Sequence, residues 1–183
     1  NKKKDKESKK IKIDLIENFN GYKKKYAKEK VFVENKIKRL GLQNYKVSIA
    51  RCYTFIGKNI LKYNYAISDL INDSNNMNVI KLNTNIDVYR SYMHSDDMCN
   101  WLITILKNSS TKCSIYNVGS DKVINLKDLT KKIATITNKK ITLKTNKSKK
   151  FDYYVPSITK AHKKLNLKIS INLNDALNSI IKI

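Results

Sequence analysis

The sequence predicts an α/β fold, in which helices alternate with strands along most of the chain. From residue 22 onward, stretches with helical spacing of apolar residues take turns with short stretches rich in β-branched and alternating residues. A chain of 183 residues of which 41% are hydrophobic is also large and apolar enough to bury a substantial core. Alternation of this kind is typical of layered folds built on parallel strands.

The first predicted elements are a basic segment, a long helix and a strand. Residues 1–21 open with NKKKDKESKK and are expected to be solvated and mobile. Apolar residues then recur at helical spacing over residues 22–40, and Gly41 is expected to end this helix in the left-handed conformation. Residues 45–51 alternate in the manner of a strand, and CYTFIGKN leaves it as a loop. In α/β sheets this carboxyl end of a strand is where ligands bind.

Helices and strands alternate through the rest of the chain. Helices are predicted at residues 64–73, 95–108, 125–137, 157–165 and 172–182, and strands at 77–82, 88–94, 113–118 and 140–144. Ser95 is the expected N-cap of its helix, and Trp101 is expected in the core on the apolar face. Asn125 is the expected N-cap of the helix that follows it.

The chain is strongly basic, with 38 Lys and Arg against 15 Asp and Glu and a net charge of +23. This charge attracts anions such as nucleic acid, acidic membranes, nucleotides and phosphosugars, and does not by itself select one. Abundant Lys, Asn and Ile with 4 Gly and 1 Pro are equally expected from an A/T-rich coding sequence.

The cysteines and the apolar runs point to a cytoplasmic protein. Cys52, Cys99 and Cys113 form neither a CxxC pair nor a Cys/His cluster, so neither a zinc site nor a disulfide framework is predicted. The apolar runs are too short to span a membrane, and the charged start lacks the apolar core of a signal peptide. A reducing cytoplasm is therefore the expected compartment.

Tyr26 and Lys30 form the most specific local pattern in the long helix. They stand at i and i+4, which puts them on one helix face with Cβ atoms about 5–6 Å apart. An ammonium at this distance stabilises a phenolate, so the pair could serve as an acid/base. In so lysine-rich a helix the same spacing arises readily by chance, and the two residues would then only be part of a solvated basic face.

The order of five segments narrows this choice. They are YAKEKVFVE (26–34), SIARCYTFIG (48–57), YRSYMHSDDMCNWLITIL (89–106), YNVGSDKVINLKDLTKKIA (116–134) and YYVPSITKAHKKLNL (153–167). Their succession resembles the C-terminal half of the extended short-chain dehydrogenase/reductase family, the NAD-dependent nucleotide-sugar epimerases and dehydratases. It looks closest to dTDP-glucose 4,6-dehydratase-like members, and it covers roughly residues 22–183.

The resemblance implies a fold of two parts: the C-terminal part of a Rossmann-like parallel sheet and a small α/β substrate-binding subdomain. Residues 22–61 would belong to a partial NAD-binding domain that carries the YxxxK helix. Residues 62–183 would belong mostly to the substrate-binding subdomain, with the strand near 113–118 returning to the main sheet.

The resemblance also implies a set of catalytic and cofactor-binding residues. Tyr26 matches the catalytic tyrosine, which exchanges a proton with the sugar hydroxyl while hydride passes to or from the nicotinamide. Lys30 matches the lysine that holds the nicotinamide ribose and stabilises the tyrosinate, so both residues would contact NAD. Arg51, Tyr53 and Phe55 match the strand-end segment that passes beside the nicotinamide and the sugar.

Substrate-binding residues are implied in the second part of the chain. Arg90 matches an arginine that contacts the nucleotide diphosphate in relatives, and the alternative is an ion pair with an acidic neighbour. Asp69 lies near a substrate-binding asparagine of many relatives. Glu34, His94 and Asp97 are expected to be structural, with Asp97 either capping its own helix or pairing with Arg90.

Two hallmarks of the family have no counterpart in these 183 residues: the Gly-rich phosphate loop and the catalytic Ser/Thr. The resemblance therefore implies a truncated, split or partial enzyme that is inactive alone and needs an N-terminal half for tight NAD binding. The expected partners are a nucleotide sugar and either that complementary half or a second copy of the chain.

Two other functions remain open from the sequence. A basic nucleic-acid or polyanion-binding protein is supported by the charge, but the sequence has no recognised binding module and no aromatic residues interleaved through the basic segments. A catalytically silent relative, retained as a partner subunit, would share the motif order without the chemistry.

Overall fold

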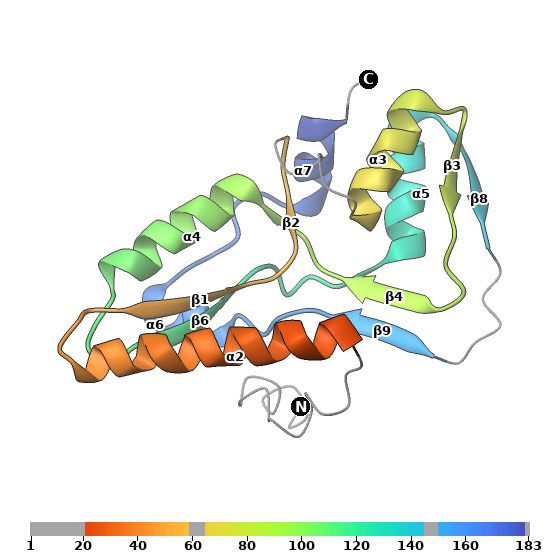
Figure 1. The fold of residues 1–183 in the computed structure, drawn as a ribbon. Helices are drawn as coiled ribbons and strands as arrows, with labels where there is room; N and C mark the ends of the chain where they lie inside the picture. Colours follow the sequence, from red (N-terminus) through yellow and green to blue (C-terminus); the bar gives the residue numbers. More distant parts are fainter. Residues whose placement is uncertain (1–20, 59–64, 145–149, 182–183) are drawn as a thin grey trace. The chain divides into compact units, whose positions relative to one another are not determined.

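A computed structural model describes residues 21–58, 65–144 and 150–181 (Figure 1). The expectation of a mobile basic segment at residues 1–21 lies, except for Gly21, outside these described residues. The described chain has the predicted α/β fold with parallel strands. It divides into two compact units, of which unit 1 is Asn1–Arg51, Trp101–Val118 and Ser157–Leu167, and unit 2 is Cys52–Asn100, Gly119–Pro156 and Lys168–Ile183.

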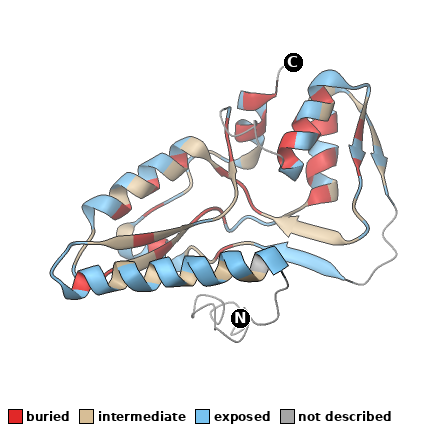
Figure 2. Cartoon of the chain, in the orientation of Figure 1, coloured by how far each residue is buried: buried red, intermediate tan, exposed pale blue. Residues whose placement is uncertain are grey.

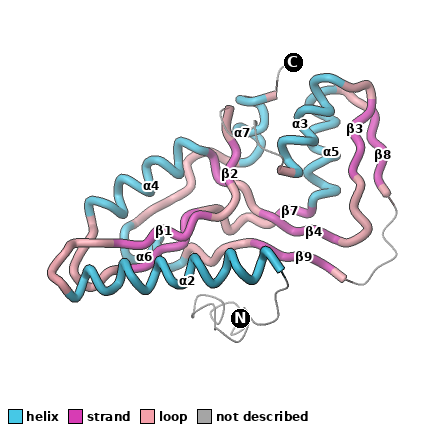
Figure 3. The backbone as a smooth tube through the Cα atoms, viewed as in Figure 1, coloured by secondary structure: helices cyan, strands magenta, loops and turns pink. Residues whose placement is uncertain are grey.

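Figure 3 shows which parts of the backbone form helices, strands and loops. The helices are α2 (Gly21–Leu42), α3 (Ala66–Asn76), α4 (Ser95–Lys107), α5 (Leu126–Thr137), α6 (Thr159–Leu165) and α7 (Leu173–Ile180). The strands are β1 (Ser48–Cys52), β2 (Phe55–Ile56), β3 (Val79–Leu82), β4 (Asp87–Arg90), β5 (Met93–His94), β6 (Ser114–Val118), β7 (Ile124–Asn125), β8 (Lys140–Leu143) and β9 (Phe151–Tyr154). The predicted helices are confirmed, with ends shifted by a few residues. None of the described helices combines the length and hydropathy that a membrane span requires.

The single strand predicted at residues 88–94 is wrong, because the chain forms two strands there. β4 pairs with β9 in parallel and with β7 in antiparallel orientation, whereas β5 pairs in parallel with β2. Ser91 and Tyr92, both buried, separate the two strands. The strand β2 lies within the stretch predicted as a loop, and its two residues are too few to produce a recognisable alternation.

In unit 1, helix α2 runs beside strands β1 and β6, which pair with each other (Figure 1). The prediction that Gly41 ends α2 is wrong, because the helix continues to Leu42 and the positive φ, 66°, occurs at Asn44. Gly41 is needed for a different reason: a Cβ there would stand 2.4 Å from the backbone oxygen of Thr111. The missing side chain thus lets α2 approach the turn before β6 closely.

An ion pair joins the middle of α2 to the end of β1. The guanidinium of Arg51 donates from Nε and Nη2 to the two carboxylate oxygens of Glu34, each at 2.7 Å. Both side chains are largely buried, with 23% of Arg51 and 16% of Glu34 exposed. The hydrogen bonds from Arg51 lower the pKa of Glu34 and outweigh burial, which acts in the opposite direction. Glu34 therefore holds α2 against β1, and this contact agrees with the structural role expected of it.

The main hydrophobic core of the described residues belongs to unit 2. Helices α3 and α5 pack on each other and against the β3–β8 pair, and α7 contributes Ala176, Leu177 and Ile180 (Figures 1 and 2). Leu129 and Ile133 of α5 are fully buried there. The Asn125 side chain accepts the Lys127 N–H, so the predicted N-cap of α5 is confirmed. In unit 1, the prediction that Trp101 is buried is also confirmed, since 1% of it is exposed.

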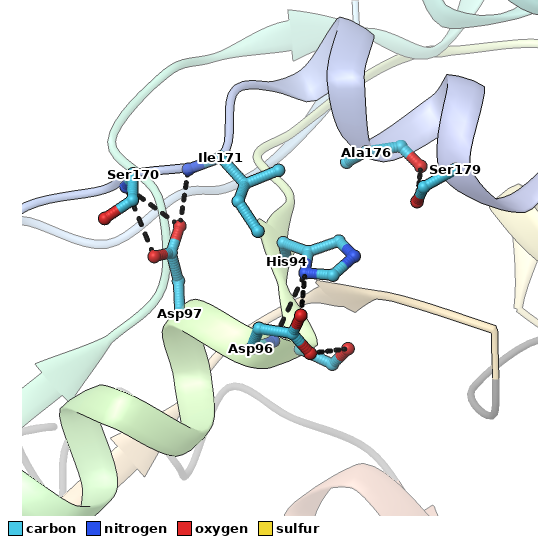
Figure 4. Close-up of polar contacts among 8 residues, drawn as sticks. His94, Asp96, Asp97, Ser170, Ile171, Ala176 and Ser179 are labelled. Atoms are coloured by element: carbon cyan, nitrogen blue, oxygen red, sulfur yellow. Dashed lines mark hydrogen bonds and ion pairs between the residues drawn. The ribbon is translucent and has the colours of Figure 1, made fainter.

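The start of α4 is held differently from what the sequence suggests (Figure 4). Ser95 is the first helical residue rather than the N-cap, and the Nδ1 of His94 accepts the Asp96 N–H at 3.2 Å. Asp97 is 3% exposed, and its carboxylate accepts the N–H of Ser170 at 3.0 Å and of Ile171 at 2.9 Å. It is structural, as expected, but it anchors the segment before α7 instead of capping α4 or pairing with Arg90.

We predict that Asp97→Asn lowers the free energy of unfolding by about 2–3 kcal/mol, because an amide group replaces a buried, charged acceptor of backbone N–H groups. Urea denaturation measures this change. The matched control is Asp96→Asn on the adjacent residue, whose side chain is 72% exposed and should change stability by no more than about 0.5 kcal/mol. Equal effects of the two substitutions would contradict the anchoring role of Asp97.

The Glu34–Arg51 pair should make stability depend on pH. Because the pKa of Glu34 is lower in the folded chain, the pair contributes stability above the ordinary glutamate value of 4.5, and this contribution is lost as pH falls through the folded value. At neutral pH, Glu34→Gln should cost about 1–3 kcal/mol.

Denaturation at a series of pH values checks this expectation. The difference between wild type and Glu34→Gln should shrink below pH 4.5. Glu29→Gln, an exposed position on the same helix, serves as the control and should show little difference at any pH. A Glu34→Gln cost that persists unchanged in acid would show that packing, not charge, accounts for it.

Candidate functional site

Tyr26 and Lys30 lie on one face of α2, as their spacing predicts. The Nζ of Lys30 is 5.4 Å from the centroid of the Tyr26 ring. Tyr26 is 51% exposed, and its ring stacks with that of Tyr22 at a centroid distance of 6.4 Å. The structure thus presents a phenol to solvent with an ammonium next to it. A phenol in this setting can exchange a proton with a bound ligand, while the cation stabilises the negative charge that results.

The face of α2 that carries Tyr26 and Lys30 continues to Glu34, which contacts Arg51 of β1. Glu34 and Lys38 follow Lys30 at successive i+4 positions, which wind slowly around the helix. Since an α-helix rises about 1.5 Å per residue, Tyr26 lies about 12 Å along the axis from Glu34. The Glu34–Arg51 pair therefore anchors the helix two turns away from the exposed phenol.

The three residues predicted to lie beside the cofactor have surroundings that differ from one residue to the next. Arg51 is engaged by Glu34, as described above. Tyr53 is half-buried and stacks with Tyr154 at a centroid distance of 4.8 Å. Phe55 is half-buried in β2, opposite Met93 of β5. Their contacts with NAD stay a prediction.

Arg90 makes the ion pair that the sequence allowed as the alternative to ligand contact. Its Nη2 donates to the Asp152 carboxylate at 2.6 Å, and its Nη1 donates to the Tyr89 carbonyl at 2.9 Å. The Cζ of Arg90 also lies 6.0 Å from the centroid of the Tyr154 ring. Because Asp152 is 51% exposed, this pair is open to water. The predicted contact of Arg90 with a diphosphate stays a prediction.

Asp69, the other predicted substrate-binding residue, is exposed in the first turn of α3. Its backbone N–H donates to the Tyr65 carbonyl at 3.0 Å. The roles implied for Tyr26, Lys30, Arg51 and Arg90 would bring the four residues together in one cleft; these residues belong to two different units, and their meeting stays a prediction.

The aromatic and acidic side chains around Arg90 were not predicted from the sequence. Tyr154 contacts both Tyr53 and Arg90, and Asp152 belongs to the same strand. The tyrosine pair in YYVPSITK was a visible signal, but β9 is exposed at every position and so lacks the alternation that marks a strand. Among the described residues there is no cluster of His, Cys, Asp and Glu that could hold a metal ion.

Comparisons with a family model and with solved structures both relate this chain to known proteins. The curated proteins contain no match, but the model of the NAD-dependent epimerase/dehydratase family matches residues 4–119. Among solved structures, RMD from Pseudomonas aeruginosa, solved with NADPH, is 20% identical with a TM-score of 0.71, over 85% of this chain and 53% of that one.

Two sugar-nucleotide epimerases have the same fold. The UDP-glucose 4-epimerase of Thermotoga maritima, solved with UDP-glucose, is 17% identical with a TM-score of 0.67, over 86% of this chain and 50% of that one. The UDP-N-acetylglucosamine 4-epimerase of Bacillus cereus is 21% identical with a TM-score of 0.60, over 72% and 43% of the two chains.

The structural matches show the fold, and the chain spans about half the length of these solved proteins. The match to the family model extends over more than half of the 183 residues. The chain therefore belongs to the NAD-dependent epimerase/dehydratase family.

Proposed function

We propose that the chain is the C-terminal portion of an NAD-dependent nucleotide-sugar epimerase or dehydratase, in which Tyr26 and Lys30 assist proton and hydride transfer at the sugar. Family membership supports the cofactor and the reaction class. The two epimerases with the same fold, named for UDP-sugars, support the substrate class. The observation that carries the proposal is the exposed Tyr26 phenol with the Lys30 ammonium 5.4 Å from its ring.

The chemistry of these two residues follows from their types and positions. Bound NAD would supply a hydride acceptor. The Tyr26 oxygen, as phenolate, would take the proton of the sugar hydroxyl while hydride leaves the carbon that bears this hydroxyl, and would return the proton in the reverse step. The Lys30 ammonium would hold the negative charge of the Tyr26 phenolate by electrostatic attraction before the proton is transferred. Oxidation of this kind opens both epimerisation and loss of water, so the same pair serves either reaction.

Two glycines of this chain, Gly41 and Gly119, do not suit the pyrophosphate of NAD. A pyrophosphate needs glycines whose backbone a phosphate can approach. A Cβ on Gly41 would stand 2.4 Å from the Thr111 oxygen, and one on Gly119 would stand 3.0 Å from Pro156 and 3.1 Å from Tyr53. Both glycines thus make room for the protein's own atoms. We therefore assign the nicotinamide end of NAD to Tyr26 and Lys30. We assign the pyrophosphate of NAD to a Gly-rich loop that is not among these 183 residues.

The predicted domain roles fit this assignment. Residues 22–61 would form the remaining part of the NAD-binding domain, and β6, which pairs with β1, would be the strand near 113–118 that returns to the main sheet. Residues 62–183 would mostly bind the nucleotide sugar, with Arg90 and Asp69 as contacts. Exposed apolar side chains on α2, including Phe32 at 59% and Leu42 at 85%, support a partner that is either the N-terminal half or a second copy.

We predict that Tyr26→Phe lowers kcat by about 100-fold or more in the form supplied with the N-terminal half, because it removes only the hydroxyl that carries the proton. Turnover of a UDP-sugar with NAD and the free energy of unfolding are measured together, and stability should be unchanged. Tyr22→Phe is the matched control, since this ring is 80% exposed and stacks on Tyr26. Retained turnover in Tyr26→Phe would reject Tyr26 as the acid/base, and absence of turnover in every version would favour a silent subunit.

We also predict that the 183-residue chain alone does not bind NAD at micromolar concentration, since Tyr26 and Lys30 reach only the nicotinamide end. Calorimetry with NAD on the purified chain, repeated after adding the N-terminal half, measures this directly. Binding should appear only in the second titration. Micromolar binding by the chain alone would place the pyrophosphate contacts within these residues.

A further inference from the structure

Unit 1 contains a pocket of about 620 Å³ with a strongly basic wall. It is lined by α2, the turn before β6, β6 itself and α6, which the fold brings together from distant parts of the chain. Five lysines contribute to the wall: Lys38, Lys112, Lys160, Lys163 and Lys164. Hydroxyl and amide groups of Ser157, Thr159 and Asn117 also line it. The pocket has the size of a typical small-molecule site.

Among the described residues, Glu34 offsets only part of the positive charge of this wall, through its pair with Arg51 and its attraction for Lys38. No acidic side chain in the described part of the chain lines the pocket. Arg51 also reaches it, but the charge of that guanidinium is offset by Glu34. Within residues 21–58, 65–144 and 150–181, none of the five lysines forms an ion pair with a carboxylate. Like charges around one concave surface repel one another and raise the local attraction for an anion.

One of these ammonium groups is held in place. The Nζ of Lys160 lies 4.9 Å from the centroid of the Tyr116 ring, and Tyr116 is buried in β6. Burial, followed by repulsion from Lys164, lowers the pKa of Lys160. An anion in the pocket would relieve this repulsion.

The pocket lies away from the candidate catalytic pair. Lys38 follows Tyr26 by twelve residues on the same helix, which corresponds to about 18 Å along its axis. The Glu34–Arg51 pair lies between these two positions on α2. A small anion in the pocket around Lys38 would therefore not reach the Tyr26 hydroxyl.

We propose that this pocket binds a small anion with a phosphate or diphosphate group. Several ammonium groups with neighbouring hydroxyl and amide donors suit a group that carries more than one charge and several acceptor oxygens. A concave pocket of limited volume fits a small molecule better than a nucleic-acid strand, which needs a groove that follows its backbone. The proposal does not depend on the proposed catalytic role of Tyr26.

Calorimetric titration of the full chain with inorganic pyrophosphate, at ionic strength held constant with chloride, tests the proposal. The pocket variant is Lys160→Gln with Lys164→Gln. The control variant is Lys25→Gln with Lys46→Gln, which removes the same charge from exposed positions that do not line the pocket. We expect wild type to bind pyrophosphate, the pocket variant to lose at least about 10-fold in affinity, and the control to change less than about 2-fold.

Two further arms make the result decisive. Melting temperatures of all variants check folding, and Lys38→Gln on α2 repeats the test if the α6 variant does not fold. ADP should bind at least as well as pyrophosphate if the pocket accepts a phosphate ester. Failure of wild type to bind either compound, or equal weakening in the pocket and control variants, would overturn the proposal. A third result would also overturn it: a short single-stranded oligonucleotide binds more tightly than pyrophosphate, its affinity falls steeply with salt, and both variants weaken this binding equally. Such binding would be surface binding to nucleic acid.

Discussion

The two charge-assisted hydrogen bonds between Glu34 and Arg51 determine how α2 is held against the sheet of unit 1. Removing either partner would leave the other largely buried and unpaired, which is costlier than the loss of a surface pair. The candidate catalytic residues, Tyr26 and Lys30, lie to one side of this anchor on α2, and Lys38 of the basic pocket lies to the other. Both candidate ligand sites of unit 1 therefore depend on one ion pair for the orientation of their shared helix.

Acidic residues are scarce in this chain, 15 against 38 basic ones, and several of them hold distant segments together. Asp97 fixes the segment before α7, Asp152 holds Arg90, and Asp87 accepts from Lys127 at 2.9 Å. Carboxylates engaged in this way are not available to neutralise the remaining lysines. An excess of cations follows, which only solvent or an external anion can balance. In the basic pocket, five of these lysines lie around a concave surface.

Periodicity predicted the helices well, because an apolar stripe at helical spacing requires a partner to cover it. The burial of Trp101 and the N-cap at Asn125 were also predicted correctly, since both depend on residues close by in the sequence. Features that depend on contacts between distant segments were not predicted correctly from the sequence. Gly41 was predicted to end a helix, but a glycine is needed there because the backbone of Thr111, seventy positions away, leaves no room for a Cβ. The lysines of the pocket, at positions 38, 112 and 160–164, share no sequence pattern and meet only because α2, β6 and α6 are neighbours. A pattern within one element cannot reveal such a site.

The two arginines that the sequence proposed as ligand contacts differ in how freely they could meet a phosphate. Arg51 forms two hydrogen bonds with a carboxylate that is 16% exposed, so exchanging Glu34 for a ligand would leave a buried acid without its partner. Arg90 forms one such bond with Asp152, which is 51% exposed, and an open pair of this kind contributes only about 0–1 kcal/mol. A diphosphate could displace Asp152 into water at little cost. Arg90 is thus the better candidate for ligand contact, whereas Arg51 is better suited to positioning α2.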